Sequence, residues 1–167
     1  MRIYALAILQ RIVSDLELMF RRPPKQQFAA LCYRETKMGL LEVLLITSRD
    51  TGRWVIPKGW PMGSKKSHLV AQREAYEEAG VKGKIAKTSF GSYFYMKGMP
   101  DGLKIPCEVK VYLLEVREFV DDYPEKGTRI LEWVSCDVAA GRVQEPQLKR
   151  LFHLLSLSRQ RKTQKAG

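Results

Sequence analysis

The sequence predicts an α/β protein in which helices flank a mixed sheet, and three features lead to that prediction. β-rich segments separated by turn signals occur on both sides of the middle of the chain. A helical segment without proline or glycine lies between them, and an amphipathic helix follows them. Helices packed against the faces of one sheet accommodate this order of elements.

The strands are expected in segments rich in β-branched and aromatic residues. Two strands joined around Gly39 and a short third strand precede the central helix, and three strands follow it. The sequence GMPDGL, residues 98–103, separates two of the later strands and is a strong turn signal. The expected strands are Gln27–Arg34, Leu41–Ser48, Arg53–Ile56, Lys84–Lys97, Ile105–Val116 and Thr128–Ser135.

The central helix is predicted from Ser67 to Ala79. Ser67 can act as the N-cap, because a serine oxygen accepts hydrogen bonds from the free N–H groups of a first turn. Gly80 stands where a residue in the left-handed conformation ends many helices. These two residues therefore set the expected limits of the helix.

Two further helices are expected near the end of the chain. Asp137 can cap a short helix that ends at Gly141. The last helix is predicted over Glu145–Gln160, with Pro146 in its first turn and leucines along one stripe. An apolar stripe of this kind indicates a helix that packs on the sheet.

Three carboxylates crowd onto one face of the central helix. Glu74, Glu77 and Glu78 fall within an arc of roughly 100°, since successive helical residues are about 100° apart. Like charges four residues apart cost roughly 0.2–0.5 kcal/mol per pair. A surface helix with chance acids is the plain alternative, but the clustering favours a divalent cation site, because Mg²⁺ and Mn²⁺ prefer oxygen ligands. Arg73, four residues before Glu77, can hold that carboxylate in a bidentate pair.

These residues resemble the Nudix box, G-x5-E-x7-R-E-U-x-E-E-x-G-U, where U is a bulky aliphatic residue. Ala75 fits its U position only loosely, and the preceding RWVIPKG segment (residues 53–59) resembles the strand and turn that lead into the box. The resemblance extends over roughly residues 26–157. The residues in register are Gly59, Arg73, Glu74, Glu77, Glu78, Gly80 and Val81.

The resemblance implies a Nudix α/β/α sandwich with a mixed central sheet. It also implies hydrolysis of a phosphoanhydride bond with Mg²⁺ or Mn²⁺ as cofactor. The catalytic base differs among members, and Glu108 and Glu125 are later candidates, although either can equally be a solvated surface acid. The implied metal ligands are Gly59, Glu74, Glu77 and Glu78, and the implied catalytic residues are Glu74 and Arg73.

Lys65 departs from the family pattern, because it stands where the box has its first glutamate. A protonated lysine cannot ligate a metal ion. Either the remaining three glutamates suffice and Lys65 meets substrate phosphates, or catalysis is lost and the domain only binds. We favour activity, since the cluster of helical carboxylates is intact.

The charge balance favours an anionic, polyphosphorylated small-molecule substrate. The chain has 29 Lys and Arg against 18 Asp and Glu, a net charge of +11. WVIPKGW and REAYEEAGVKGKI resemble the branch that acts on diphosphoinositol polyphosphates and dinucleoside polyphosphates. One tyrosine of YFY, residues 93–95, can stack on a base or lie in the core. The predicted substrate-binding residues are Arg49, Arg53, Lys58, Lys65 and Lys66.

We divide the chain into an N-terminal helical extension and linker (residues 1–25), a Nudix hydrolase domain (26–158) and a basic disordered tail (159–167). The extension can support oligomer formation, and the tail leaves RNA binding or processing as an alternative function. A catalytically weak module that binds a nucleotide or partner is another alternative. No apolar run approaches the roughly 18 residues of a membrane span. Three widely spaced cysteines suggest reduced thiols and a cytoplasmic location.

Overall fold

The structure is a computed structural model that describes residues 23–165, with side chains as far as residue 161. Strands lie on both sides of one helix along this range and two helices come last, in the order that the sequence predicts. The elements are β1 (Lys25–Glu35), β2 (Leu41–Thr47), β3 (Trp54–Val55), β4 (Lys58–Gly59), α2 (Ser67–Ala79), β5 (Val81–Ile85), β6 (Gly91–Gly98), β7 (Lys104–Phe119), β8 (Leu131–Val134), α3 (Cys136–Arg142) and α4 (Pro146–Lys165).

All the described strands belong to one sheet with the central order β3-β2-β1-β7-β5. β4 pairs with β1, β6 with β7, and β8 with β2. β1 and β7 run parallel, with Lys25 paired with Cys107 at one end and Tyr33 with Glu115 at the other. The other strand pairs within residues 23–165 are antiparallel. The predicted mixed sheet is therefore confirmed.

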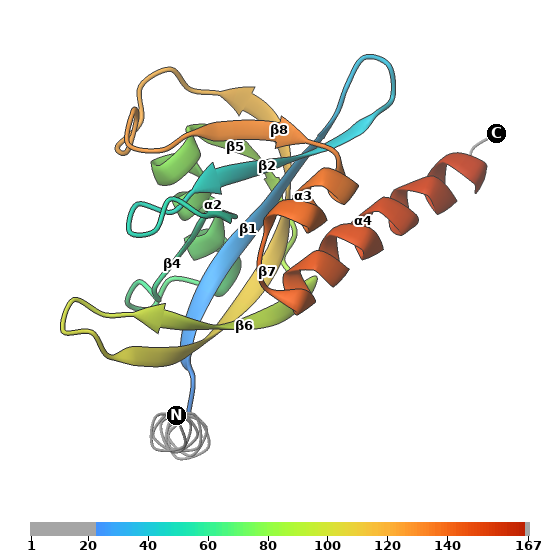
Figure 1. Ribbon diagram of the computed structural model, residues 1–167. Helices are drawn as coiled ribbons and strands as arrows, with labels where there is room; N and C mark the ends of the chain where they lie inside the picture. The colour runs from blue at the N-terminus through green and yellow to red at the C-terminus, as the bar shows by residue number, and fades with distance from the viewer. Residues whose placement is uncertain (1–22, 166–167) are drawn as a thin grey trace, which may run out of the picture.

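Alternation along β1 explains why both faces of the sheet carry helices. Ala29, Leu31 and Tyr33 face one way, into a core that they share with residues of α3 and α4. Ala30 and Cys32 face the other way, into a core that they share with residues of α2. A strand buried on both faces reads as a continuous apolar run rather than an alternating one. The expected α/β/α sandwich is confirmed, and Figure 1 shows α2 behind the sheet with α3 and α4 in front.

Several expected element ends need correction. Lys66, not Ser67, is the N-cap of α2, and its side chain makes no capping hydrogen bond. Ser135, not Asp137, caps α3, where its side-chain oxygen accepts a hydrogen bond from the backbone N–H of Val138. α2 thus begins at Ser67 as expected, whereas α3 begins at Cys136, two residues before the start that a cap at Asp137 implies. The single strand expected over Lys84–Lys97 is divided between β5 and β6, with a turn from residue 86 to residue 90.

The basic tail expected to be disordered from residue 159 is helical as far as Lys165. Its sequence of arginine, lysine and glutamine residues has good helix propensity, and no proline or glycine interrupts it before residue 167. Arg159 also lies against the sheet, with its guanidinium 4.4 Å from the centre of the Tyr33 ring. Packing and propensity together therefore continue α4 beyond the expected boundary.

The predicted N-terminal helical extension lies outside the described residues, except for its last residues, and Lys25 already belongs to β1. The division into a Nudix domain and two terminal segments stays a prediction. The three cysteines are buried and free of disulfide bonds. No helix in the described range is long and apolar enough to cross a membrane.

Candidate active site

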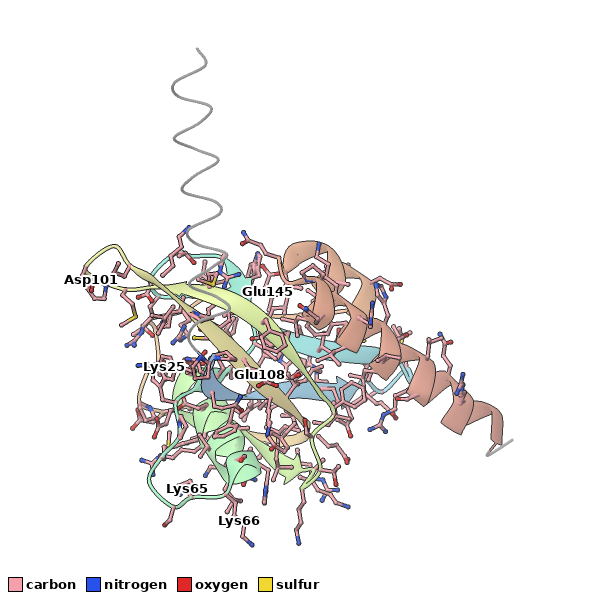
Figure 2. The ribbon with its side chains drawn as sticks, turned by 90° about the horizontal axis from the view of Figure 1, so that it is seen from below. Lys25, Lys65, Lys66, Asp101, Glu108 and Glu145 are labelled. Carbon is pink, nitrogen blue, oxygen red and sulfur yellow. The ribbon has the colours of Figure 1, made fainter. Side chains whose placement is uncertain are left out.

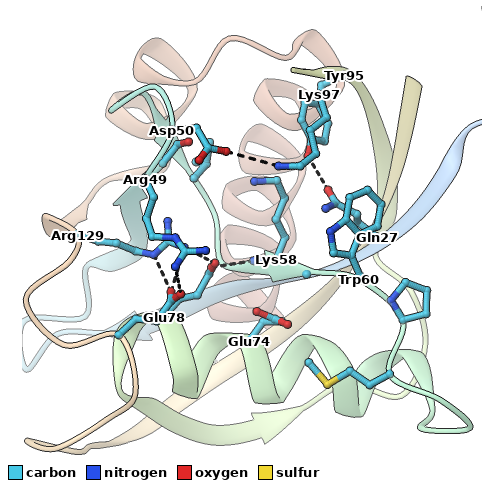
Figure 3. A pocket seen from close by; sticks show the side chains of 16 residues that line it. Gln27, Arg49, Asp50, Lys58, Trp60, Glu74, Glu78, Tyr95, Lys97 and Arg129 are labelled. Carbon is cyan, nitrogen blue, oxygen red and sulfur yellow. Dashed lines mark hydrogen bonds and ion pairs between the residues drawn. The ribbon is translucent and has the colours of Figure 1, made fainter. Parts of the chain in front are cut away.

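A cavity of about 380 Å³ opens between the start of β4, the face of α2 and the loop that precedes β8. Figure 3 shows Glu74 and Glu78 next to α2, with Arg129 beside Glu78, while the ends of the Lys58 and Lys97 side chains lie farther from α2, near Asp50. Side chains from distant parts of the sequence meet here, since β1 brings β4 and β7 together at the centre of the sheet. The lining residues are Gln27, Ser48, Arg49, Asp50, Val55, Lys58, Gly59, Trp60, Pro61, Met62, Glu74, Glu78, Tyr95, Lys97, Glu125 and Arg129.

Gly59 and the end of the Glu74 side chain approach each other so closely that any side chain at position 59 would displace the Glu74 carboxylate. A Cβ atom on Gly59 would lie 2.0 Å from Oε1 of Glu74. Burial, followed by the neighbouring carboxylates of Glu78, Glu77 and Glu125, raises the pKa of Glu74 to about 7, and the positive charge of Arg129 opposes that rise. Glu74 is thus a crowded carboxylate held against the backbone of β4.

Glu78 is nearly buried and uses both of its oxygens. Oε1 accepts a hydrogen bond from the Arg129 guanidinium at 2.6 Å, and Oε2 accepts one from the backbone N–H of Lys58 at 3.1 Å. Burial raises the pKa of Glu78, while the positive charges of Arg129 and Lys58 oppose that rise. These contacts fix the carboxylate at the junction between α2 and β4.

The loop after β7 is attached to the end of α2 by backbone contacts. Gly80 ends α2 with φ of 64°, and its carbonyl accepts a hydrogen bond from Val120 N–H at 2.7 Å. A Cβ on Gly80 would lie 2.4 Å from the Tyr123 ring, so the close contact also requires glycine. Glu125 N–H donates to the carbonyl of Glu77 at 3.0 Å. The loop therefore carries its side chains to the acidic helix.

Arg129 is the cation at the centre of that loop, and its side chain is only 6% exposed. It donates to the carboxylates of Glu78 and Glu125 and, at 2.9 Å, to the carbonyl of Thr47. Ile130 N–H also donates to the side-chain oxygen of Thr47 at 2.9 Å. Arg129 thus joins the helix, the loop and the end of β2 through one guanidinium group.

The structure separates Glu77 from the other two helical glutamates. Its carboxylate pairs with Arg73, four residues earlier, at 2.5 Å, and neither side chain lines the cavity. The expected Arg73–Glu77 pair is therefore present on the half-exposed side of α2. The glutamates that do line the cavity are Glu74, Glu78 and Glu125, the last of which the sequence offered as a possible base, and Asp50 adds a fourth carboxylate. Glu108, the other candidate, accepts a hydrogen bond from Gln26 at 2.5 Å and does not line the cavity.

The predicted phosphate-binding cations differ in where they lie. Arg49 and Lys58 line the cavity, whereas Lys65 and Lys66 are exposed on the loop before α2, at the outer edge of the molecule in Figure 2. Arg53 lies beside the cavity, where it pairs with the buried carboxylate of Glu145 at 2.5 Å. The structure thus groups three of the five predicted residues at or beside the cavity and leaves the two lysines outside it.

Lys58 is a partly buried cation of the site. Its ammonium nitrogen lies 5.4 Å from the centre of the Tyr95 ring. Burial lowers the pKa of Lys58 to about 8, and the charge of Glu78 partly offsets this effect. Of the YFY tyrosines, Tyr93 is in the core while Tyr95 lines the cavity and donates a hydrogen bond to the side-chain oxygen of Gln27 at 2.6 Å.

Sequence reasoning missed Arg129, Asp50, Lys97 and Gln27. Arg129 follows the family box by about fifty residues and carries no local motif. Asp50 belongs to a turn, and Lys97 to an alternating strand. Only their long-range placement brings them to the cavity, so no local signal could have identified them.

The residues present fit a magnesium or manganese ion. Within residues 23–165, no three His, Cys, Asp or Glu side chains stand together as a complete metal site. Mg²⁺ does not need one, because it commonly uses one or two carboxylates together with waters and substrate phosphates. Glu74 and Glu78 line the same cavity, Gly59 adds a backbone carbonyl beside them, and the mutual repulsion of the acids favours a cation between them.

The fold and this site define a Nudix-type domain, an α/β/α sandwich whose acidic helix lies along a cation-lined cavity. No protein-family model matches the chain. It is 31% identical to Nudix hydrolase 16, mitochondrial, of Arabidopsis thaliana over 116 residues, which is 66% of this chain and 62% of that protein. It is 33% identical to diphosphoinositol polyphosphate phosphohydrolase 3-alpha of Homo sapiens over 119 residues, which is 69% of this chain and 66% of that protein.

The chain belongs to the Nudix hydrolase family, as the resemblance of its box predicted. It spans a little under two thirds of the length of these two relatives. A crystal structure of a C. elegans Ap4A hydrolase binary complex superposes with a TM-score of 0.61 and 20% identity, covering 80% of this chain and 96% of that one. At that identity the similarity supports the fold alone.

Proposed function

We propose that the protein is a divalent-metal-dependent pyrophosphohydrolase that cleaves a phosphoanhydride bond in a highly phosphorylated small molecule. The observation that carries this proposal is the arrangement of the cavity. Glu74 and Glu78 lie on one side, and Lys58 and Lys97 on the other. Carboxylates suit a divalent cation, and lysines suit phosphate oxygens. A polyphosphate chain complements such a cavity along its length.

In this proposal the cofactor is Mg²⁺ or Mn²⁺, held by Glu74, Glu78 and the Gly59 carbonyl, while Glu77, the fourth residue of the expected set, lies outside the cavity in its pair with Arg73. The bound cation would neutralise phosphate oxygens and lower the pKa of an attacking water. Arg129 would act as a positioning residue, because it holds the Glu78 carboxylate in place through a hydrogen bond. Arg73 would do the same for Glu77.

The proton-transfer step is proposed for Glu74, with Glu125 as the alternative. A general base works best when its pKa lies near the operating pH. The pKa of Glu74, about 7, meets that condition in the metal-free protein. Glu125 lines the same cavity, but Arg49 and Arg129 both bind its carboxylate. Those ion pairs occupy both carboxylate oxygens, which would otherwise be open to a water.

The substrate class is supported by the relatives and by the cations. One relative is named a diphosphoinositol polyphosphate phosphohydrolase, and one structural neighbour an Ap4A hydrolase. We therefore propose a diphosphoinositol polyphosphate or a dinucleoside polyphosphate. Lys58 and Lys97 would each meet a phosphoryl group, so additional phosphates should improve binding, and salt should weaken the effect.

The decisive experiment measures phosphate release from ADP-ribose, diadenosine tetraphosphate and a diphosphoinositol pentakisphosphate, each with and without Mg²⁺ or Mn²⁺. We expect metal-dependent release, with kcat/KM rising from the two-phosphate substrate to the polyphosphorylated ones and the advantage shrinking at high ionic strength. Binding without turnover of any substrate would favour a catalytically weak binding module. A best rate for ADP-ribose at every salt concentration would retain the hydrolase and reject the polyphosphate substrate.

A further inference from the structure

A second cavity, of about 590 Å³, adjoins the first and continues it away from the acidic helix. It lies between the turn that joins β2 to β3 and the hairpin that joins β6 to β7. Six residues line both cavities, so the two form one continuous space. The shared residues are Ser48, Asp50, Val55, Lys58, Tyr95 and Lys97.

An ion pair connects the two rims of this space. Asp50 belongs to the β2–β3 turn and Lys97 to β6, and the Lys97 ammonium lies 3.6 Å from a carboxylate oxygen of Asp50. The Asp50 side chain is 73% exposed and that of Lys97 is 27% exposed. Figure 3 shows the pair crossing the cavity beside the end of the Lys58 side chain. An acid in this position is unexpected in a cavity suited to phosphates.

The other cations at the site differ in whether they form an ion pair with a carboxylate. Arg49 is paired with Glu125, and Arg53 with Glu145. Lys58 forms no ion pair with any carboxylate of the described range, although it is partly buried and lines both cavities. Lys58 is therefore ready for an anion, whereas Lys97 must first leave Asp50.

We propose that Asp50 is a specificity-determining residue that holds Lys97 in reserve, so that only a ligand with two or more linked phosphoryl groups recruits both lysines. A single phosphoryl group would occupy Lys58 and leave the Asp50–Lys97 pair in place. A longer ligand extends into the second cavity and exchanges Asp50 for a phosphate oxygen as the partner of Lys97. The inference rests on the proposed function, because it assigns the same cavity to a polyphosphorylated ligand.

The energetics suit an exchangeable contact. Exposed ion pairs contribute little to stability, so Lys97 loses little when it changes partner. The carboxylate of Asp50 would also repel a phosphate that arrives at Lys97, and removal of its charge should therefore strengthen binding. We expect Asp50→Asn to tighten the binding of tripolyphosphate about two- to fivefold, equivalent to ~0.4–1 kcal/mol. Orthophosphate should gain much less, because it does not extend to Lys97.

The test is isothermal titration calorimetry on the full chain, freed of metal ions on a chelating resin and kept at constant ionic strength. The probes are orthophosphate, pyrophosphate and tripolyphosphate. The variants are Asp50→Asn, Lys97→Met and the double variant. Glu115→Gln is a matched control, because Glu115 forms an exposed ion pair with Arg117 at 3.6 Å and does not line either cavity.

We expect Asp50→Asn to strengthen the binding of tripolyphosphate but not of orthophosphate, and Lys97→Met to weaken tripolyphosphate binding. The double variant should bind like Lys97→Met, since Asp50 acts through Lys97. Equal gains for both anions, or the same gain in Glu115→Gln, would mean that Asp50 changes only the general charge, and would overturn the proposal. Failure of the unmodified protein to bind tripolyphosphate would overturn it too.

These outcomes are independent of catalysis. Binding is measured without metal, so a protein that binds tripolyphosphate selectively but hydrolyses nothing would retain this inference and reject the proposed function. The opposite outcome is metal-dependent hydrolysis of a polyphosphate, with kcat/KM unchanged in Asp50→Asn and no difference in binding between the probes. That outcome would retain the proposed function and reject this inference.

Discussion

Glu78 and Arg129, which are 51 residues apart in sequence, form a nearly buried ion pair with 2.6 Å between the carboxylate and guanidinium groups. The pair joins the acidic helix to the loop before β8, and the same guanidinium contacts Glu125 and the carbonyl of Thr47. Arg129 therefore remains anchored if Glu78 turns one lone pair toward a metal ion. A carboxylate that is oriented in this way is already positioned for coordination.

We predict that Glu78→Gln lowers kcat at saturating metal by at least about 100-fold, the usual scale for loss of an electrostatic catalytic group. It should also lower the free energy of unfolding by about 1–3 kcal/mol, because a buried charged hydrogen bond becomes a neutral one. Steady-state kinetics and urea unfolding measure the two effects. Glu132→Gln is the control, since Glu132 pairs with Arg142 at an exposed position. Unchanged kcat in Glu78→Gln would remove Glu78 from the catalytic site.

A second prediction concerns Gly59. The missing side chain leaves room for the Glu74 carboxylate, so Gly59→Ala should displace it, weaken Mn²⁺ binding about tenfold or more and cost about 1–3 kcal/mol of stability. Mn²⁺ affinity can be measured by electron paramagnetic resonance without any substrate. Gly141→Ala is a suitable control, because no atom lies within 4 Å of a Cβ at that position. Normal Mn²⁺ affinity in Gly59→Ala would show that the position of Glu74 does not matter for the metal.

The third prediction is the pH dependence of stability in the metal-free protein. The pKa of Glu74 is raised from 4.5 to about 7 in the folded state, so the folded protein binds more protons than the unfolded protein between these values. The free energy of unfolding should therefore fall as the pH rises from about 4.5 to about 7 through this group. Glu74→Gln should flatten that part of the profile, measured by thermal unfolding at a series of pH values. A profile identical to that of the unmodified protein would reject the raised pKa.

The fold, and the helix that carries Glu74 and Glu78, were predicted well from the sequence, because both depend on local patterns. The helix from Ser67 to Ala79 has a clear end at Gly80, and its spacing places Glu74 and Glu78 on one face. The resemblance to the box also pointed to Gly59. The structure gives a physical reason for a glycine there, because a Cβ at this position would collide with the Glu74 carboxylate. Local patterns of this kind are retained in the folded structure.

The cations of the site were predicted less well, because sequence proximity is a poor guide to which charges share a cavity. Lys65 and Lys66 are close to the box in sequence, yet they are exposed outside the cavity. Lys97 and Arg129 are remote in sequence, yet the pairing of β6 with β7 and the docking of the loop on α2 bring them to the site. Long-range strand pairing leaves no local sequence pattern that would identify one such residue as part of the cavity.

The last prediction separates Lys58 from Lys65 as contacts of substrate phosphate. Lys58 is partly buried in the cavity, and a charge-assisted hydrogen bond to phosphate there contributes about 1.5–3 kcal/mol, or roughly 10- to 100-fold in affinity. Lys58→Met should therefore raise KM by about that factor, whereas Lys65→Met should change KM by less than about twofold, because salt and water screen an exposed charge. Both constants are measured with the best substrate at low and high salt, with Lys84→Met as a control on the edge strand β5. A larger effect of Lys65 than of Lys58 would mean that the loop before α2 closes over the substrate and that the phosphates lie on the outer side of the acidic helix.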